Sequence, residues 1–173
     1  MKSLSASFVL GKASAGNANI EHNNREYIAD NIDPNRMHHN ITYANQYVGH
    51  AYEELFSEAV AEYNLKQKQP CRRIRDYFTH ISDGNREEPY YEVVVQFGDM
   101  KSAGVGTPAG ELATKMLDEY MQSFQQRNPN LHVFSAHLHL DEASPHLHID
   151  FIPRIIYLRG VFYGQNFNFE TPV

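Results

Sequence analysis

This sequence contains a single cysteine and no long hydrophobic run. The single cysteine, Cys71, excludes an internal disulfide and is typical of a protein that works in a reducing compartment. No stretch approaches the roughly 18 consecutive apolar residues of a membrane-spanning helix. The apolar run at residues 4–10 is too short for the core of a signal peptide. The sequence therefore predicts a soluble protein of the cytoplasm.

Cations are also scarce, because 15 Lys and Arg residues stand against 21 Asp and Glu residues, for a formal net charge of -6. Domains that bind nucleic acid non-specifically are usually basic, so this balance argues against that class. A bound divalent cation would neutralise part of the acidic excess. The cations that are present crowd into residues 66–75, as Lys66, Lys68, Arg72, Arg73 and Arg75. We interpret this run either as a solvated helix face or as a contact to a DNA backbone.

A length of 173 residues with 42% hydrophobic residues predicts one domain, 1–173, with a sizeable core. Alternating and helical apolar patterns predict strands near 5–10 and 91–97, helices near 50–65, 72–81 and 107–124, and a hairpin at 132–153. Residues 155–158 are expected to extend the sheet. The polar segment 20–43 has no clear period. This order predicts an α+β sandwich, an antiparallel sheet of about five strands with helices packed on its apolar face and the other face left open.

The hairpin is the most informative stretch, because its residues alternate cleanly between two faces. One face is apolar and takes Phe134, Ala136, Leu138, Leu140, Leu147, Ile149 and Phe151. The other face takes four imidazoles and a carboxylate, those of His137, His139, His146, His148 and Asp150. Histidines on the polar face of a hairpin are often merely solvated, but so many on one face favour a shared role.

Imidazole is a common ligand for divalent metals, and two His separated by one residue on a strand can reach the same ion. A third ligand from the neighbouring strand would give a three-histidine site with open positions, which suits catalysis. Asp141 and Glu142 lie in the turn, where they can orient an imidazole or hold a metal-bound water. The hairpin therefore predicts a metal site.

Three motifs follow one another along the chain. His22-Asn23-x-Arg25 comes first, and residues 31–43 then contain an Asp-Pro-x-Arg-x-x-x-Asn core. The hairpin carries His139-x-Asp141-Glu142-x-x-Pro145-His146-x-His148, closed by Pro153. Together they resemble, from about residue 5 to residue 153, the plasmid mobilisation and recombination (Mob/Pre) relaxases. These belong to the HUH endonucleases, named for two His flanking a hydrophobic residue, here Leu147.

The resemblance implies the two-layer sandwich of an HUH relaxase. It also implies an enzyme that nicks one DNA strand at a plasmid or mobile-element origin of transfer and transfers that strand through a covalent 5′-phosphate intermediate. It assigns the metal to His139, His146 and His148, with His137 and Asp141 in supporting positions. Mn²⁺ or Mg²⁺ is expected, while Zn²⁺, Co²⁺ or Ni²⁺ would also suit imidazole ligands. The catalytic residues would be His22, as nucleophile, and Glu142, and the DNA contacts would be Arg25, Arg36, Asn40 and Tyr43.

Several alternatives stay open at this point. Tyr27 or Tyr43 would replace His22 in a tyrosine relaxase, and Tyr157 or Tyr163 would suit an HUH replication initiator or transposase. Two further interpretations are a module that binds origin DNA without cutting it and a three-histidine enzyme that acts on a small molecule. The resemblance also implies a bacterial cytoplasmic protein that binds single-stranded or hairpin DNA. The chain would be the N-terminal part of a longer protein whose C-terminal region contacts accessory proteins.

Overall fold

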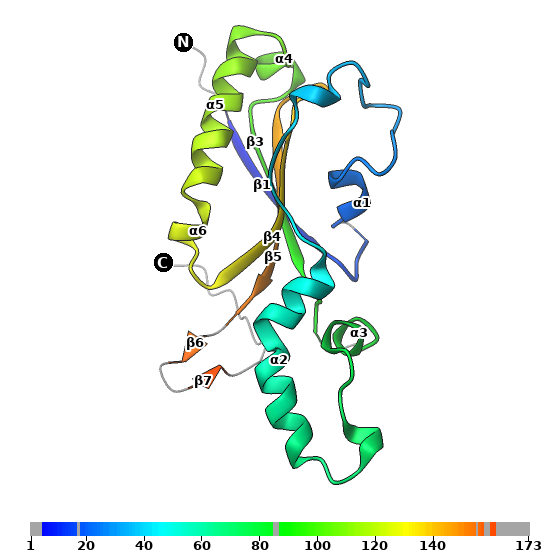
Figure 1. The fold of residues 1–173 in the computed structure, drawn as a ribbon. Helices are drawn as coiled ribbons and strands as arrows, with labels where there is room; N and C mark the ends of the chain where they lie inside the picture. Colours follow the sequence, from blue (N-terminus) through cyan, green and yellow to red (C-terminus); the bar gives the residue numbers. More distant parts are fainter. Residues whose placement is uncertain (1–4, 17, 85–86, 155, 158–159, 162–173) are drawn as a thin grey trace.

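Five strands form one antiparallel sheet in the order β1-β3-β5-β4-β2, so β4 and β5 lie inside it (Figure 1). The computed structural model describes residues 5–16, 18–84, 87–154, 156–157 and 160–161. The strands of this sheet are β1 (Ala6–Lys12), β2 (Ile41–Asn45), β3 (Tyr91–Phe97), β4 (Leu131–His139) and β5 (His146–Pro153). The expected α+β class and five-stranded antiparallel sheet are confirmed.

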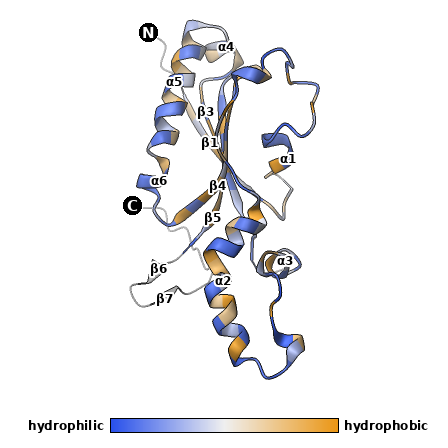
Figure 2. Ribbon diagram, in the orientation of Figure 1, coloured by the Kyte–Doolittle hydropathy of each residue, from blue (hydrophilic) through white to orange (hydrophobic). Residues whose placement is uncertain are grey.

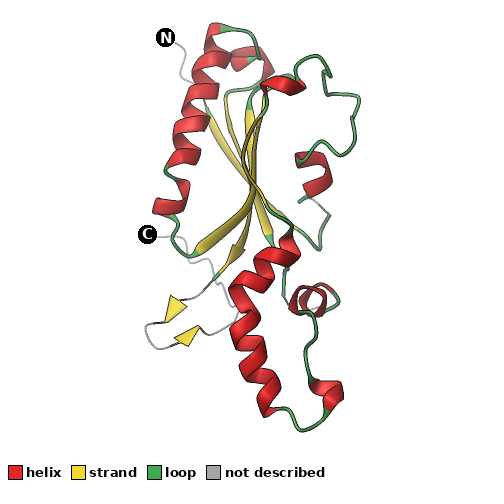
Figure 3. Ribbon diagram, in the orientation of Figure 1, coloured by secondary structure: helices red, strands yellow, loops and turns green. Residues whose placement is uncertain are grey.

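Helices lie on both sides of this sheet, as Figure 3 shows. The α-helices are α1 (Ile20–Asn23), α2 (Val48–Lys66), α3 (Tyr77–Ser82), α4 (Met100–Ala103), α5 (Pro108–Gln122) and α6 (Phe124–Arg127). Two short 3-10 turns, η1 (Met37–His39) and η2 (Pro70–Arg72), precede β2 and α3. None of the described helices is both long and apolar enough to span a membrane.

The helix α5 covers one face of the sheet together with α6 (Figure 1). It begins where Thr107 Oγ1 accepts a hydrogen bond from Gly110 N at 3.0 Å, with Pro108 in its first turn. Its apolar stripe, visible in Figure 2 as alternating colours, faces the central strands. The buried members of this cluster are Val95, Leu117, Phe124, Ala136, Leu138, Leu147 and Ile149.

The helices α2 and α3 pack in a second cluster, around Phe134 and Ile152. Ile152 follows Asp150 and His148 at two-residue spacing, so this cluster lies on the histidine-bearing face. The register of β4 against β5 shifts between Val133 and Ser135, and this β-bulge turns Phe134 away from the α5 face. The prediction that Phe134 lies on the same face as Ala136 was wrong. The prediction that helices pack on only one face of the sheet was also wrong.

The histidine face is also not open. His137, His139, His146 and His148 are all buried, and the exposed fraction of His139 is 1%. The helix α1 covers them, because the ring of His22 and the backbone of Asn23 both reach His139. The polar segment 20–43, in which the sequence shows no clear hydrophobic period, therefore covers this face.

The described residues after β5 do not extend the main sheet as expected. β6 (Ile156–Tyr157) and β7 (Gly160–Val161) pair only with each other, in a separate two-stranded sheet. The other two residues of the expected extension, 155 and 158, lie outside the described residues, as does Tyr163.

Candidate functional site

The two central strands bring their imidazoles into one cluster. In the register of β4 against β5, His139 stands opposite His146 and His137 opposite His148. The ring centroid of His139 lies 5.3 Å from that of His146 and 4.8 Å from that of His148, and the latter two are 5.0 Å apart. The structure thus brings together the three residues expected to hold a metal, while His137 lies beside His139 with its centroid at 6.2 Å.

A fourth imidazole reaches the cluster from the start of the chain. Asn19 caps α1 by accepting a hydrogen bond from His22 N at 3.0 Å, which fixes the helix turn that carries His22. The centroid of the His22 ring lies 5.9 Å from those of His139 and His148. The expected nucleophile is therefore next to the expected metal ligands, although more than a hundred residues separate them in sequence.

Glu142 lies between His22 and His146. Its Oε1 is 3.3 Å from His22 Nε2 and 3.6 Å from His146 Nε2, and its Oε2 accepts a hydrogen bond from Asn31 at 2.7 Å. Burial alone raises the pKa of Glu142, but the neighbouring His146 and Arg25 lower it to about 2. Glu142 is therefore an ionised carboxylate inside the cluster.

Arg25 and Asp141 form a buried ion pair beside the cluster. Arg25 Nε and Nη2 donate to the two carboxylate oxygens of Asp141 at 2.9 and 2.6 Å, a bidentate arrangement, and Nη2 also donates to Glu142 at 2.9 Å. Arg25 has a left-handed backbone, with φ of 57°. Asn40 donates to the same Asp141 carboxylate at 2.6 Å and accepts from Leu140 N at 2.7 Å. Arg25, Asn40 and Asp141 thus lock the turn after β4 in place.

Sequence reasoning missed Glu92, on β3. Its Oε1 lies 2.6 Å from His148 Nδ1, and Asn23 donates both to this oxygen at 2.7 Å and to Asp150 at 3.1 Å. Burial and the neighbouring Glu92 charge raise the pKa of Asp150 to about 7. The one available signal was Glu92 itself, the single charged residue in the predicted strand 91–97.

Burial favours the neutral form of His22, His137, His139 and His148, which leaves a lone pair on each of these rings. Burial, followed by the charges of His148 and Arg25, lowers the pKa of His139 to about 2, and burial lowers that of His137 to about 4. Burial also lowers the pKa of His22 and of His148. Neutral imidazoles can accept a metal ion without first losing a proton.

This donor set fits a divalent cation. His139 Nδ1 and His148 Nε2 are buried without a hydrogen-bond partner, an arrangement that a ligand would satisfy. Two overlapping groups have donor atoms within 4.8 Å of one another: His22, His139 and His148, and His139, Glu142 and His146. Imidazole and carboxylate ligands suit Mn²⁺, and the same set also suits Zn²⁺ or Co²⁺. His139 belongs to both groups and is the residue that they share.

The remaining expected site residues lie at varied distances from the cluster. Arg36 pairs with Asp33 at 2.9 Å and points toward the carbonyls of residues 140 and 141. Tyr43 packs on the α5 face and donates its hydroxyl to Asp118 at 2.7 Å, so the structure does not bring it to the imidazoles. Tyr27 is exposed, with its ring centroid 6.2 Å from that of His22.

Two crystal structures of the MobM relaxase domain (MOBV; Mob_Pre), Mn-bound and in complex with plasmid pMV158 oriT DNA of 22 nt, resemble this structure. The one at pH 5.5 is 21% identical with a TM-score of 0.50, and the one at pH 4.6 is 23% identical with a TM-score of 0.50. Each match covers 89% of this chain and 72% of the other. The fold is therefore that of a relaxase domain.

The sequence specifies the family more closely. The chain belongs to the plasmid recombination enzymes, the Mob_Pre family, whose model matches residues 15–155. No curated protein matches the sequence. The family resemblance found in the three motifs is thereby confirmed, and the matched range contains all of the imidazoles described above.

Proposed function

We propose that this protein is a relaxase that nicks one DNA strand at an origin of transfer and later rejoins or transfers it, through a covalent protein–5′-phosphate intermediate. The observation that carries the proposal is the buried cluster of imidazoles on β4 and β5, which His22 joins from a separate element. Membership in the plasmid recombination enzyme family and the DNA-bound, Mn-bound state of MobM support it. Under this proposal the protein works in the bacterial cytoplasm, where plasmid DNA is found.

His139, His146 and His148 would hold the divalent cation, Mn²⁺ or Mg²⁺ in the cell, with Glu142 adjacent to it. The bound ion would polarise the scissile phosphate and stabilise the charge that develops on it. The lowered pKa values of His139 and His148, and the nitrogens of these two rings that have no hydrogen-bond partner among the described residues, support this assignment.

His22 would be the nucleophile. Arg25 Nη1 donates to His22 Nε2 at 3.0 Å, so the neutral ring carries its proton on Nδ1 and its lone pair on Nε2. Once the scissile phosphate takes over the hydrogen bond from Arg25, this lone pair is free to attack phosphorus. A phosphorus–nitrogen bond forms while the bond from phosphorus to the 3′ oxygen breaks, and that oxygen leaves with its electron pair and takes a proton from water. The ionised Glu142 stabilises the positive charge that His22 acquires. Rejoining is the reverse of this step.

Arg25 is engaged with Asp141 and Glu142, so we propose that it orients the turn and adds positive charge near the phosphate. Arg36, whose side chain is 32% exposed, remains available to contact DNA. Asn40 is held by Asp141 and the backbone of β4 and supports the same turn.

The test is incubation with labelled single-stranded origin DNA from the plasmid or element that encodes this chain, with Mn²⁺ or with a chelator, followed by a denaturing gel. Wild type should form a metal-dependent adduct, and His22→Ala should form none. The adduct should release its DNA in mild acid, because a phosphorus–nitrogen bond is acid-labile whereas a phosphotyrosine bond is not. An adduct formed by His22→Ala would reassign the nucleophile, with Tyr27→Phe as the next variant to examine.

A second comparison separates nicking from binding. His146→Ala together with His148→Ala should abolish the adduct while DNA binding persists, since these residues are assigned to the chemistry. Wild type that binds origin DNA in the presence of Mn²⁺ and never forms an adduct would instead indicate a non-cutting DNA-binding module.

A further inference from the structure

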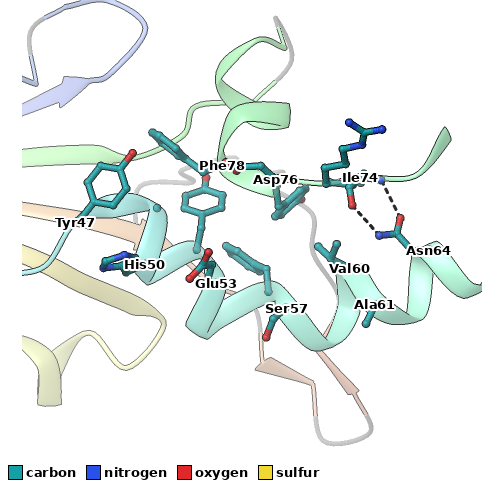
Figure 4. Close-up of a pocket in the computed structure, with 15 residues that line it drawn as sticks. Tyr47, His50, Glu53, Ser57, Val60, Ala61, Asn64, Ile74, Asp76 and Phe78 are labelled. Carbon is teal, nitrogen blue, oxygen red and sulfur yellow. Dashed lines mark hydrogen bonds between the residues drawn. The ribbon is translucent and has the colours of Figure 1, made fainter. Parts of the chain in front are cut away.

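A cavity of about 500 Å³ lies between α2 and the segment that leads into α3. None of its lining residues belongs to the imidazole cluster, and its size lies within the roughly 300–1,000 Å³ range of ligand pockets. Figure 4 shows the residues that line it. They include five phenylalanine and tyrosine rings, a histidine and an arginine: Tyr47, Tyr52, Phe56, Tyr77, Phe78, His50 and Arg75.

Tyr47 stands at one end of this cavity, exposed but held in position. Its side chain is 63% exposed, although it immediately precedes α2. A Cβ atom on Gly49 would lie 2.5 Å from Tyr47 Cε1, so the glycine lets the ring lie against the first turn of the helix. His50 and Phe78 meet the ring edge-on, with centroids at 5.4 and 6.4 Å. The result is a fixed aromatic surface that is open to solvent.

Asn64 fastens the opposite end of the cavity. Its Nδ2 donates to the carbonyl of Ile74 at 2.7 Å, and its Oδ1 accepts from the Ile74 N–H at 2.8 Å (Figure 4). Asp76 then caps α3 by accepting from Thr79 N at 2.9 Å. These contacts hold the segment that carries Arg75 against α2, so the shape of the cavity is fixed by the fold.

The segment that leads into α3 places Arg75 in the lining of the cavity and Arg72 shortly before it, in a protein whose formal net charge is -6. Lys66 is paired with Glu62, but within the described part of the chain neither Arg72 nor Arg75 has an ion-pair partner. Glu53 and Asp76 also line the cavity, and Asp76 is used as the cap of α3. Exposed aromatic rings beside free guanidinium groups are what proteins use to bind unpaired nucleic acid, by stacking on bases and pairing with phosphates.

We propose that this cavity binds an unpaired stretch of the DNA substrate, with one base stacked on Tyr47 and the adjoining phosphates on Arg72 and Arg75. The inference rests on the proposed function, which supplies single-stranded DNA as the ligand. The geometry is compatible with one continuous strand, because α3 and α1 lie on the same side of the sheet (Figure 1). DNA that leaves the imidazole cluster can therefore run along this side to the cavity.

The test uses fluorescence anisotropy of the 173-residue chain with a fluorescein-labelled oligothymidine, a probe that needs no knowledge of the origin sequence. Tyr47→Leu should weaken binding by about 5- to 150-fold, the range measured when one stacking ring is lost, and Tyr47→Trp should preserve it. Tyr63→Leu is the matched control, because Tyr63 is 44% exposed on the same helix and does not line the cavity. Its affinity should equal that of wild type.

The phosphate contacts are tested separately by salt dependence. Arg75→Gln should reduce the slope of log affinity against log salt concentration by about 0.7, the value for one phosphate contact to a single strand. Lys115→Gln, on the α5 helix, should leave the slope unchanged. Thermal melts of each variant identify any that fail to fold, and photocrosslinking of wild type to an oligonucleotide containing 5-iodouracil should label the peptide that carries Tyr47.

The outcomes separate this inference from the proposed function. If wild type forms the covalent adduct but Tyr47→Leu and Arg75→Gln bind oligothymidine as wild type does, the cavity is not a DNA site and the nicking activity stands. If crosslinks fall only outside 47–78, or if the variants lose a protein partner instead of DNA, the inference is overturned. Wild type that binds no single-stranded DNA at all would overturn both. His22→Ala, by contrast, should keep its oligothymidine affinity while losing the adduct.

Discussion

His148 shows how a single hydrogen bond prepares an imidazole for its role. Its Nδ1 lies 2.6 Å from the Glu92 carboxylate, which fixes the proton on Nδ1 and directs the lone pair of Nε2 into the cluster. His146 is oriented in the same way by the carbonyl of Ser144, at 2.9 Å from its Nδ1. Both nitrogens that face the cluster are thus the Nε2 atoms, set by groups outside it.

Glu92→Gln should therefore weaken metal binding although Glu92 is not a ligand. The substitution keeps the shape of the side chain and removes the charge that holds the His148 proton, and losses of this kind typically cost about 10- to 100-fold in metal affinity. Titration calorimetry with Mn²⁺ measures the effect. Glu111→Gln, on the surface of α5, should bind Mn²⁺ as wild type does. Equal affinities of wild type and Glu92→Gln would show that His148 needs no such partner.

Arg25 and Asp141 matter for stability because their ion pair is almost fully out of solvent. The exposed fractions of their side chains are 7% and 0%. Arg25→Ala would leave the Asp141 carboxylate buried without its cation, which costs about 3–5 kcal/mol in the free energy of unfolding. Arg36→Ala removes an ion pair whose side chains are 32% and 40% exposed and should cost less than about 1 kcal/mol. Urea denaturation compares the two, and similar losses would contradict the argument.

At the scale of elements, the bulge in β4 decides what each helix packs against. Phe134 is 1% exposed and lies in the cluster of α2 and α3 rather than under α5. Phe134→Ala should lower the free energy of unfolding by about 3–5 kcal/mol, the usual cost of emptying a buried aromatic site. Hydrogen exchange should accelerate in α2 and α3 and change little in α5. Faster exchange confined to α5 would show that Phe134 faces the other layer.

The regular elements were predictable because their patterns are local. Strands β1 and β3 and helices α2 and α5 fall within a few residues of their predicted ranges, since each carries a clean apolar period. The bulge was not predictable, because two-residue alternation is read on the assumption that no residue is inserted into the strand. The strand β2 was missed inside a polar segment, since Ile41–Asn45 has mixed burial and shows no alternation.

The candidate site likewise has a part that the sequence predicts and a part that it does not. The histidines of the hairpin share a face by alternation alone, so their proximity followed from the sequence. The position of His22 came from the resemblance to a family, because no local pattern relates α1 to β4. Glu92 could not be assigned, since its partner His148 stands on a different strand, and only the β3-β5 register brings the two together.

At the scale of the whole molecule, the site joins segments that the unfolded chain keeps far apart. Its donors come from α1, from β4 and the turn after it, and from β5. The strands β4 and β5 are neighbours in sequence, but α1 is held over them by contacts such as the 3.0 Å approach of His139 Nε2 to the carbonyl of Asn23. A ligand that bridges His22 or Glu142 with the strands would therefore bind the folded state only.

Metal binding should consequently stabilise the whole fold. An ion that binds only the folded state stabilises it by about 2.7 kcal/mol at a concentration 100 times its Kd. For a chain of this size each kcal/mol raises the melting temperature by roughly 2–4 °C. Saturating Mn²⁺ should then raise the melting temperature of wild type by roughly 5–10 °C, measured by calorimetry. The His146→Ala, His148→Ala double variant should show no rise, and an equal rise in both proteins would place the bound ion elsewhere.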